Sequence, residues 1–235
     1  MSELEGRVAL VTGATGGIGR ALVARLRGAG LTVVATTRRA EGSGLPDGVD
    51  VVEADMRQAD ALPGLVAAVQ ERHGALDVLV PNAGAGERRS LEDTTREDWD
   101  AALAVNLTAP FLLAQAAVPA MAARGFGRVL LVSSVAAFTG GAIGPHYAAS
   151  KAGLQGLVGF LSSRYAARGV TVNAIAPAAI GGTGMGDALP AETVAAIPVG
   201  RTGEPAEVAD LALAMLANGY LTGKTVLLDG GMLPR

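Results

Sequence analysis

Short apolar runs rich in β-branched residues alternate along the chain with longer segments of helical character. The runs predict strands over 7–12, 32–37, 49–54, 76–80, 128–133, 170–175 and 225–228. Most of them are apolar almost throughout, which is typical of strands buried on both faces of a sheet. Between them, the spacing predicts helices over 17–27, 62–72, 97–123, 147–167 and 205–216. This alternation is typical of βαβ units around a parallel sheet.

The predicted architecture is a single α/β domain over residues 1–235, a Rossmann-type doubly wound parallel sheet with helices on both faces. One segment breaks the alternation, because 177–203 contains three prolines and six glycines after a predicted strand. We interpret it as a loop, with room for a short helix, that covers the substrate. Open parallel sheets bind ligands beyond the carboxyl ends of their strands, so residues that follow strands are the candidates for function.

Composition narrows the classes of function. The net charge of −3 and the scattered cations argue against a nucleic-acid partner, since phosphate neutralisation needs clustered Lys and Arg. The chain has no cysteine, and His73 and His146 lie far apart in sequence, so no metal site is expected. We find no secretory leader and no uninterrupted apolar stretch long enough to span a bilayer. A cytoplasmic protein with a small-molecule partner is therefore expected.

A glycine-rich turn follows the first predicted strand at once and leads into a helical segment. It reads Thr12-Gly13-Ala14-Thr15-Gly16-Gly17-Ile18-Gly19. Glycines let the backbone turn tightly and approach a pyrophosphate, whose charge is favoured at a helix amino terminus. We therefore predict a dinucleotide site, against the alternative of a merely structural turn, with contacts from Gly13, Thr15, Gly16, Gly17, Ile18 and Gly19.

The residues after the second predicted strand indicate which dinucleotide binds. A protein that binds NAD usually presents an acid there to the ribose hydroxyls, whereas this chain presents Arg38 and Arg39. A guanidinium pairs with a 2′-phosphate through charge-assisted hydrogen bonds and gains little from a bare hydroxyl. The sequence thus favours NADP(H), with Arg38 as the first candidate and Arg39 as the second. The alternative is two solvated arginines after a strand.

Tyr147 and Lys151 form a Tyr-x-x-x-Lys pair one helical turn apart, so the phenol and the ammonium share one face of a helix. A nearby positive charge is expected to lower the pKa of the phenol from about 10 towards neutrality, where it exchanges a proton with a carbonyl or alcohol oxygen. Ser134 follows the fifth predicted strand and is well placed to stabilise negative charge on that oxygen. Together with the phosphate turn, these residues predict hydride transfer to or from a carbonyl carbon.

With these motifs in this order, the chain resembles the short-chain dehydrogenase/reductase family over essentially its whole length, most closely the 3-oxoacyl-carrier-protein reductases. The resemblance implies an NADPH-dependent reductase of a 3-oxoacyl thioester or related β-ketone, small or carrier-bound, with Tyr147 as the proton donor. The resemblance also implies that Asn106 kinks its helix and holds a water beside Lys151. Lys151 itself would bind the hydroxyls of the nicotinamide ribose. The resemblance further implies a homotetramer, in which the Asn106 and Tyr147 helices pair across a dimer axis.

The resemblance also implies further cofactor contacts, from Asp55, Met56, Asn82, Ala83, Gly84, Pro177, Ile180 and Thr183. Asp55 would contact the adenine, with a role as a helix cap or turn former as an equal alternative, and Thr183 would contact the carboxamide. Pro81 and Ala178 replace the residues usual in the family, and the sequence around Thr183 matches its motif only loosely. These departures leave the substrate open. The alternative functions are an alcohol or sugar dehydrogenase working oxidatively and a nonenzymatic NADPH-binding regulator.

Overall fold

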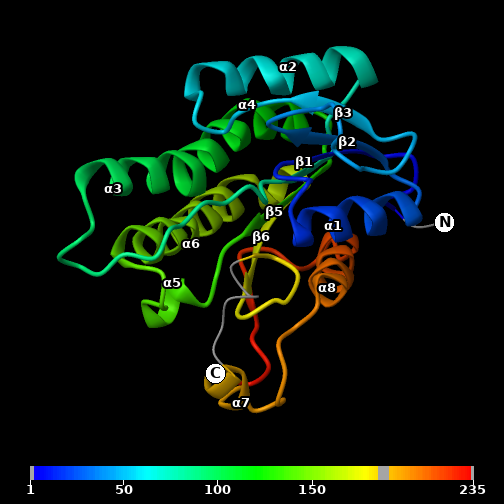
Figure 1. The fold of residues 1–235 in the computed structure, drawn as a ribbon. Helices are drawn as coiled ribbons and strands as arrows, with labels where there is room; N and C mark the ends of the chain where they lie inside the picture. Colours follow the sequence, from blue (N-terminus) through cyan, green and yellow to red (C-terminus); the bar gives the residue numbers. More distant parts are fainter. Residues whose placement is uncertain (1–2, 185–190, 234–235) are drawn as a thin grey trace.

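Seven parallel strands form one sheet in the computed structural model, which describes residues 3–184 and 191–233 (Figure 1). The strands are β1 (Val8–Val11), β2 (Thr32–Thr37), β3 (Asp50–Glu53), β4 (Val78–Val80), β5 (Gly127–Val132), β6 (Val170–Pro177) and β7 (Thr225–Leu228). Their order is β3-β2-β1-β4-β5-β6-β7, so the direction of winding reverses between β1 and β4. The predicted doubly wound parallel sheet is confirmed, and ligands of such sheets bind at this reversal.

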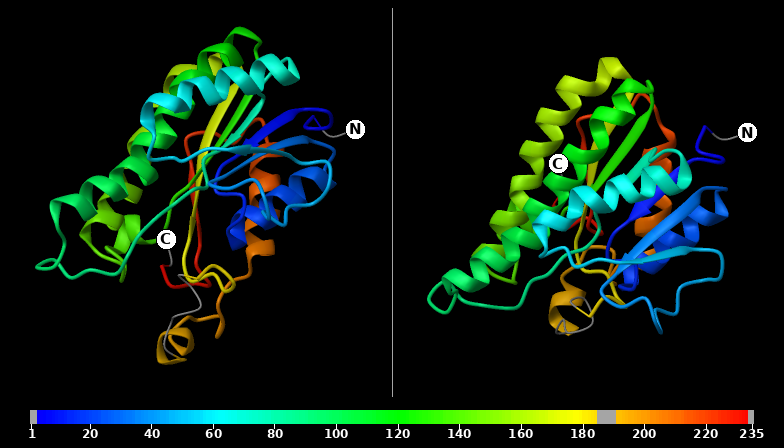
Figure 2. Two further views of the ribbon diagram at one scale, coloured as in Figure 1. Left: turned by 45° about the horizontal axis from the view of Figure 1, so that its top comes forward. Right: turned by 90° about the horizontal axis from the view of Figure 1, so that it is seen from above.

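Helices cover both faces of the sheet. Figure 2 shows α1 (Gly17–Gly28) and α8 (Pro205–Ala217) on one side, and α2 (Leu62–His73), α4 (Ala109–Ala123) and α6 (Pro145–Tyr165) on the other. The remaining elements are short: η1 (Ala59–Ala61), α3 (Arg96–Leu103), the π-helical turn η2 (Ala104–Thr108), α5 (Ala136–Thr139), η3 (Ala166–Arg168) and α7 (Ala191–Ala195).

The hydrophobic core consists of two apolar layers, one on each face of the sheet. Leu10 of β1 and Leu79 of β4 pack in the layer under α2, α4 and α6, whereas their neighbours Val11 and Val80 pack in the layer under α1 and α8. Successive side chains of a strand point to opposite faces, so a strand covered on both sides is apolar at every position. This arrangement explains the continuous apolar runs in the sequence.

The long helical stretch of 96–123 is one continuous helix made of α3, η2 and α4. By length and mean hydropathy it is apolar enough to cross a membrane, which corrects the expectation that no stretch is. Its charged residues are confined to the first turns, so the Ala-rich remainder reaches a high mean hydropathy. However, 44% of its most apolar window is buried inside the protein, where Leu113 and Met121 belong to the core. The helix thus serves as a cover of the sheet.

The segment 177–203 begins as strand and ends as irregular chain. β6 extends to Pro177, two residues beyond its predicted end, because it pairs with β7 as far as Leu228. An isolated parallel bridge joins Ile180 to Gly203, and the short helix α7 lies between them in sequence. Residues 185–190 of this segment lie outside the described residues.

Candidate active site

A cavity of about 1150 Å³ opens at the carboxyl end of the sheet. It extends from the glycine turn after β1 to the residues after β5 and β6. Of the predicted site residues described, only Arg39 and Asn106 do not line it. Those that do are Gly13, Thr15, Gly16, Gly17, Ile18, Gly19, Arg38, Asp55, Met56, Asn82, Ala83, Gly84, Ser134, Tyr147, Lys151, Pro177, Ile180 and Thr183.

The turn after β1 has its shape because glycine occupies the crowded positions. Gly13 has a left-handed φ of 64°, and a Cβ placed on it would lie 2.8 Å from the Ala83 Cα. A Cβ on Gly19 would collide with the carbonyl oxygen of Gly13. The N-cap of α1 is Gly16, which has no side chain to satisfy the first amides of the helix. These N–H groups are therefore available to an anionic ligand in the cavity.

Asn82 ties the glycine turn to the chain after β4. The Thr12 hydroxyl accepts hydrogen bonds from the amides of Asn82 (3.1 Å) and Ala83 (3.0 Å). In return, Asn82 Nδ2 donates to the carbonyl oxygens of Thr12 (2.9 Å) and Gly13 (3.2 Å). The predicted Asn-Ala-Gly turn thus fixes the position of the glycine turn across the reversal of the sheet.

Charged side chains gather at the end of the cavity beyond β2 and β3. Both oxygens of Asp55 accept from Arg57, at 3.0 Å from Nε and 2.5 Å from Nη2. This hydrogen bonding, assisted by the charges of Arg57 and Arg38, lowers the pKa of Asp55 to about 2. Arg38 and Arg39 are both exposed and follow the end of β2 at Thr37, but only Arg38 lines the cavity. The structure thus distinguishes the two arginines, which the sequence only ranked.

Ser134, Tyr147 and Lys151 meet where α6 passes the end of β5. Ser134 lies near the Tyr147 phenol and acts to lower its pKa, and both side chains line the cavity. Lys151 Nζ lies 5.8 Å from the centre of the Tyr147 ring and donates to the carbonyl oxygen of Val132 (2.8 Å). Ser133, by contrast, donates its hydroxyl to the Lys151 carbonyl oxygen (3.1 Å) and so holds the backbone of α6. A phenol, a hydroxyl and an ammonium therefore share one wall of the cavity.

Burial, and not the neighbouring charge, determines the acidity of this group of residues. Tyr147 is 6% exposed, and burial raises the pKa of its phenol, an effect that the nearby Ser134 hydroxyl opposes. Burial also lowers the pKa of Lys151 to about 8. The prediction that the ammonium makes the phenol more acidic is therefore wrong for this structure, because the loss of hydration outweighs any attraction between the two groups.

Asn106 connects three segments behind the cavity. It lies in η2, where a wider π-helical turn takes the place of the predicted kink. Its amide accepts from Ala85 N (2.8 Å) and donates to Ala85 O (2.8 Å) and Ser150 Oγ (3.0 Å). A Cβ placed on Gly84 would lie 3.4 Å from both Asn106 Oδ1 and Lys151 Nζ. Asn106 is thus a positioning residue that joins the chain after β4 to α6.

Replacing Asn106 with alanine is expected to destabilise the protein by about 2–4 kcal/mol. The change removes the two part-buried hydrogen bonds to Ala85 and the buried one to Ser150, and each lost hydrogen bond costs about 0.5–1.5 kcal/mol. Urea unfolding followed by circular dichroism measures the effect. Asn218→Ala, at an exposed site, is the matched control. A loss below about 0.5 kcal/mol for Asn106→Ala would contradict a structural role for these bonds.

Several lining residues were not predicted from the sequence. Arg57 lines the cavity, and its position two residues after Asp55, beyond a predicted strand, could have indicated this from the sequence. Ile143, Met232 and Leu233 also line the cavity, but no local motif marks them. The covering segment also contacts the phosphate end of the site. A Cβ on Gly17 would collide with the carbonyl oxygen of Gly182, so the start of α1 and this segment pack backbone against backbone.

Known proteins resemble the chain along nearly its whole length. The family model described as short chain dehydrogenase matches residues 7–193. A 3-oxoacyl-[acyl-carrier-protein] reductase of Thermotoga maritima is 36% identical, over 98% of this chain and 99% of its own length. The corresponding reductase of Vibrio cholerae is also 36% identical, over 98% of both chains. An acetoacetyl-CoA reductase of Rhizobium meliloti is 37% identical, over 96% of this chain and 98% of its own.

Proposed function

Because the chain belongs to the short-chain dehydrogenase family, whose members act on a ketone or an alcohol, we propose that it is an NADPH-dependent ketoreductase. The observation that carries the proposal is that Ser134, Tyr147 and Lys151 line the same cavity as the glycine turn. A dinucleotide held at that turn and a ketone held at the phenol would meet within one enclosed space. Binding alone would not require the phenol, which argues against the regulator.

The residues around the glycine turn fit a nicotinamide dinucleotide. Gly13, Gly17 and Gly19 let the backbone of the turn pack closely against neighbouring backbone, and the uncapped amides of α1 suit a pyrophosphate. Arg38 would hold the 2′-phosphate, and Asp55, already paired with Arg57, would lie beside the adenosine. Lys151 would bind the nicotinamide ribose from α6. When bound, the cofactor supplies the hydride.

The protonated phenol of Tyr147 suits the role of the acid in reduction. A phenol with a pKa above its ordinary value stays protonated near neutral pH, so it is an acid ready to donate its proton to a carbonyl oxygen. The Ser134 hydroxyl donates a hydrogen bond to the same oxygen as negative charge develops on it, and Lys151 adds positive charge nearby. A dehydrogenase working oxidatively would instead need the phenolate as a base.

The substrate end of the cavity suits an apolar chain. Val135, Ile143 and Ile197 line it, together with Ile180 of the covering segment. A sugar would leave many hydroxyls without partners on such a surface. The printed names of the relatives specify acyl-carrier-protein and CoA thioesters, so we propose a 3-oxoacyl thioester or a related β-ketone.

Consumption of NADPH and NADH in the presence of acyl thioesters, diketones, quinones and simple ketones tests the proposal. We expect reduction of β-keto thioesters with NADPH. Tight binding of NADPH without reduction of any carbonyl compound would instead support the regulator.

Replacing Arg38 with aspartate is expected to lower kcat/KM for NADPH by about 10- to 100-fold, which corresponds to the loss of one or two charge-assisted hydrogen bonds. The value for NADH should stay the same or rise, because a carboxylate accepts from ribose hydroxyls. Arg39→Asp is the matched control, since Arg39 is adjacent but does not line the cavity. Equal effects of the two substitutions would exclude Arg38 as the phosphate contact.

We also propose that the protein is a cytoplasmic homotetramer. Gly153 packs against Leu107, but a Cβ on Gly156 or Gly159 would meet no described atom within 4 Å. Interior helix glycines cost about 1 kcal/mol each and are explained by close approach to another chain. Phe111 and Phe160 are 42% and 59% exposed on α4 and α6. These features support pairing of the two helices with those of a second subunit.

A further inference from the structure

Arg88 belongs to the segment that passes over the Tyr147 ring. A Cβ on Gly86 would lie 2.6 Å from Tyr147 Cδ2, so the chain there touches the ring directly. The amide of Arg89 donates to the carbonyl oxygen of Ile143 (2.8 Å), which fixes the backbone on the other side of Arg88. The base of the Arg88 side chain is therefore held close to the catalytic phenol.

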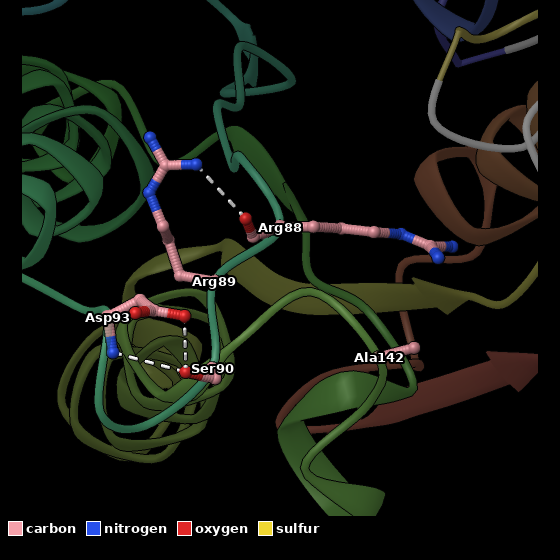
Figure 3. A pocket seen from close by; sticks show the side chains of 5 residues that line it. All are labelled: Arg88, Arg89, Ser90, Asp93 and Ala142. Atoms are coloured by element: carbon pink, nitrogen blue, oxygen red, sulfur yellow. Dashed lines mark hydrogen bonds between the residues drawn. The ribbon is translucent and has the colours of Figure 1, made fainter.

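The acidic groups near Arg88 are already paired with other side chains. Glu87 pairs with Arg89 Nη1 (2.9 Å), and Arg89 Nε also lies 3.4 Å from Asp98. Asp93 accepts from the Ser90 hydroxyl (2.8 Å) and does not line the active-site cavity. Figure 3 shows the Arg88 side chain extending away from Arg89, with only its backbone oxygen accepting a hydrogen bond. Within the described part of the chain, the guanidinium of Arg88 has no partner.

Arg88 lies at the border between two hollows. It lines the active-site cavity and also a shallow pocket of about 510 Å³ formed with Arg89, Ser90, Asp93 and Ala142. The other cations that line the cavity among the described residues are at different places: Arg38 and Arg57 lie around Asp55, and Lys151 is buried behind the phenol. Arg88 is thus the cation available at the mouth of the substrate end.

We propose that Arg88 binds an anionic group, carboxylate or phosphate, that the substrate carries away from its ketone. The inference rests on the proposed ketoreductase function and adds a determinant of substrate choice to it. An unpaired guanidinium offers two parallel donors to a planar or tetrahedral anion, and a neutral substrate has nothing to accept them. At the mouth of the cavity, this contact holds the far end of the substrate while the ketone lies at Tyr147.

Steady-state kinetics with Arg88→Gln test the proposal on three substrates. Acetoacetyl-CoA carries phosphates, acetoacetate carries a carboxylate, and the N-acetylcysteamine thioester of acetoacetate is neutral. We expect KM to rise about tenfold for at least one charged substrate, with kcat within about twofold, and to stay unchanged for the neutral thioester. Which charged substrate responds identifies the anion as phosphate or carboxylate. Arg88→Lys, which keeps the charge without the fork, should lose less.

Salt dependence gives a second measurement that needs no variant. Raising the ionic strength should increase KM of the wild-type enzyme for the responsive anion and leave KM for the neutral thioester unchanged.

Arg96→Gln, at an exposed arginine outside the cavity, is the matched control for Arg88→Gln. It should change neither KM for the charged substrates nor KM for the neutral thioester. If the wild type reduces all three substrates and Arg88→Gln affects them equally or not at all, the role of Arg88 is overturned and the proposed function stands. If the wild type reduces none of the panel of ketones, both fall.

Discussion

Replacing Tyr147 with phenylalanine is expected to lower kcat by about a thousandfold while leaving the Kd for NADPH within about twofold. The substitution removes the proposed proton donor but keeps the ring that packs against Gly86. General acid catalysis by a positioned group contributes about 10²- to 10⁴-fold. NADPH oxidation with a reducible ketone gives kcat, and quenching or enhancement of NADPH fluorescence gives the Kd.

Tyr220→Phe is the control for this experiment, because Tyr220 is 99% exposed. Its kinetics should equal those of the wild type. Activity of Tyr147→Phe within tenfold of the wild type would mean that another group supplies the proton. Loss of NADPH binding would mean that the phenol serves the cofactor site more than the chemistry.

Replacing Lys151 with methionine is expected to stabilise the protein at pH 7 by about 2 kcal/mol and to lower kcat/KM by about a hundredfold or more. The pKa of Lys151 falls from 10.5 to about 8 on burial. That difference corresponds to a cost of ~3 kcal/mol for burying the ammonium, of which about 1 kcal/mol is offset by the hydrogen bond to Val132. Methionine fills a similar volume without the charge, so the protein should gain stability and lose a group that we propose to be catalytic.

The pH dependence follows from the same shift in pKa. Below pH 8 the lysine is protonated in both the folded and the unfolded chain, so the cost of burial is fully present. Between pH 8 and 10.5 the unfolded chain binds the proton and the folded chain does not, so stability rises with pH. Urea unfolding at pH 7 and pH 10 should show the gap between the wild type and Lys151→Met narrowing. A loss of stability in the variant at pH 7, with exposed Lys224→Met unchanged, would contradict this account.

Much of the site could be predicted because its residues follow strands. The order of strands, the glycine turn and the Tyr147–Lys151 spacing are properties of local sequence, and local sequence also placed Ser134 after β5. Arg38 and Arg39, however, are adjacent arginines after the end of β2, and only the folded chain shows that Arg38 is the one that lines the cavity. Sequence could rank the two but could not separate them.

The acidity of Tyr147 required the folded structure. Spacing indicates that Lys151 is near, but the sign of the shift in pKa depends on how much water both groups lose, and that is set by α6, β5 and the segment around Gly86 together. Met232 and Leu233 were missed for a similar reason, since they reach the cavity only through the fold of the chain after β7. The π-helical turn at Asn106 likewise depends on Ala85 and Ser150, which are distant in sequence.

The backbone contact between Gly17 and Gly182 has a consequence for the sequence of events in turnover. The segment that contains Gly182 packs against the start of α1, whose amides suit a pyrophosphate. Its Ile180 also lines the cavity where the substrate is proposed to bind. If this segment must shift for the dinucleotide to exchange, a departing alcohol leaves first and the oxidised coenzyme leaves last. We therefore expect compulsory-order kinetics in which coenzyme departure limits the turnover number, a property set by two residues that have no side chains.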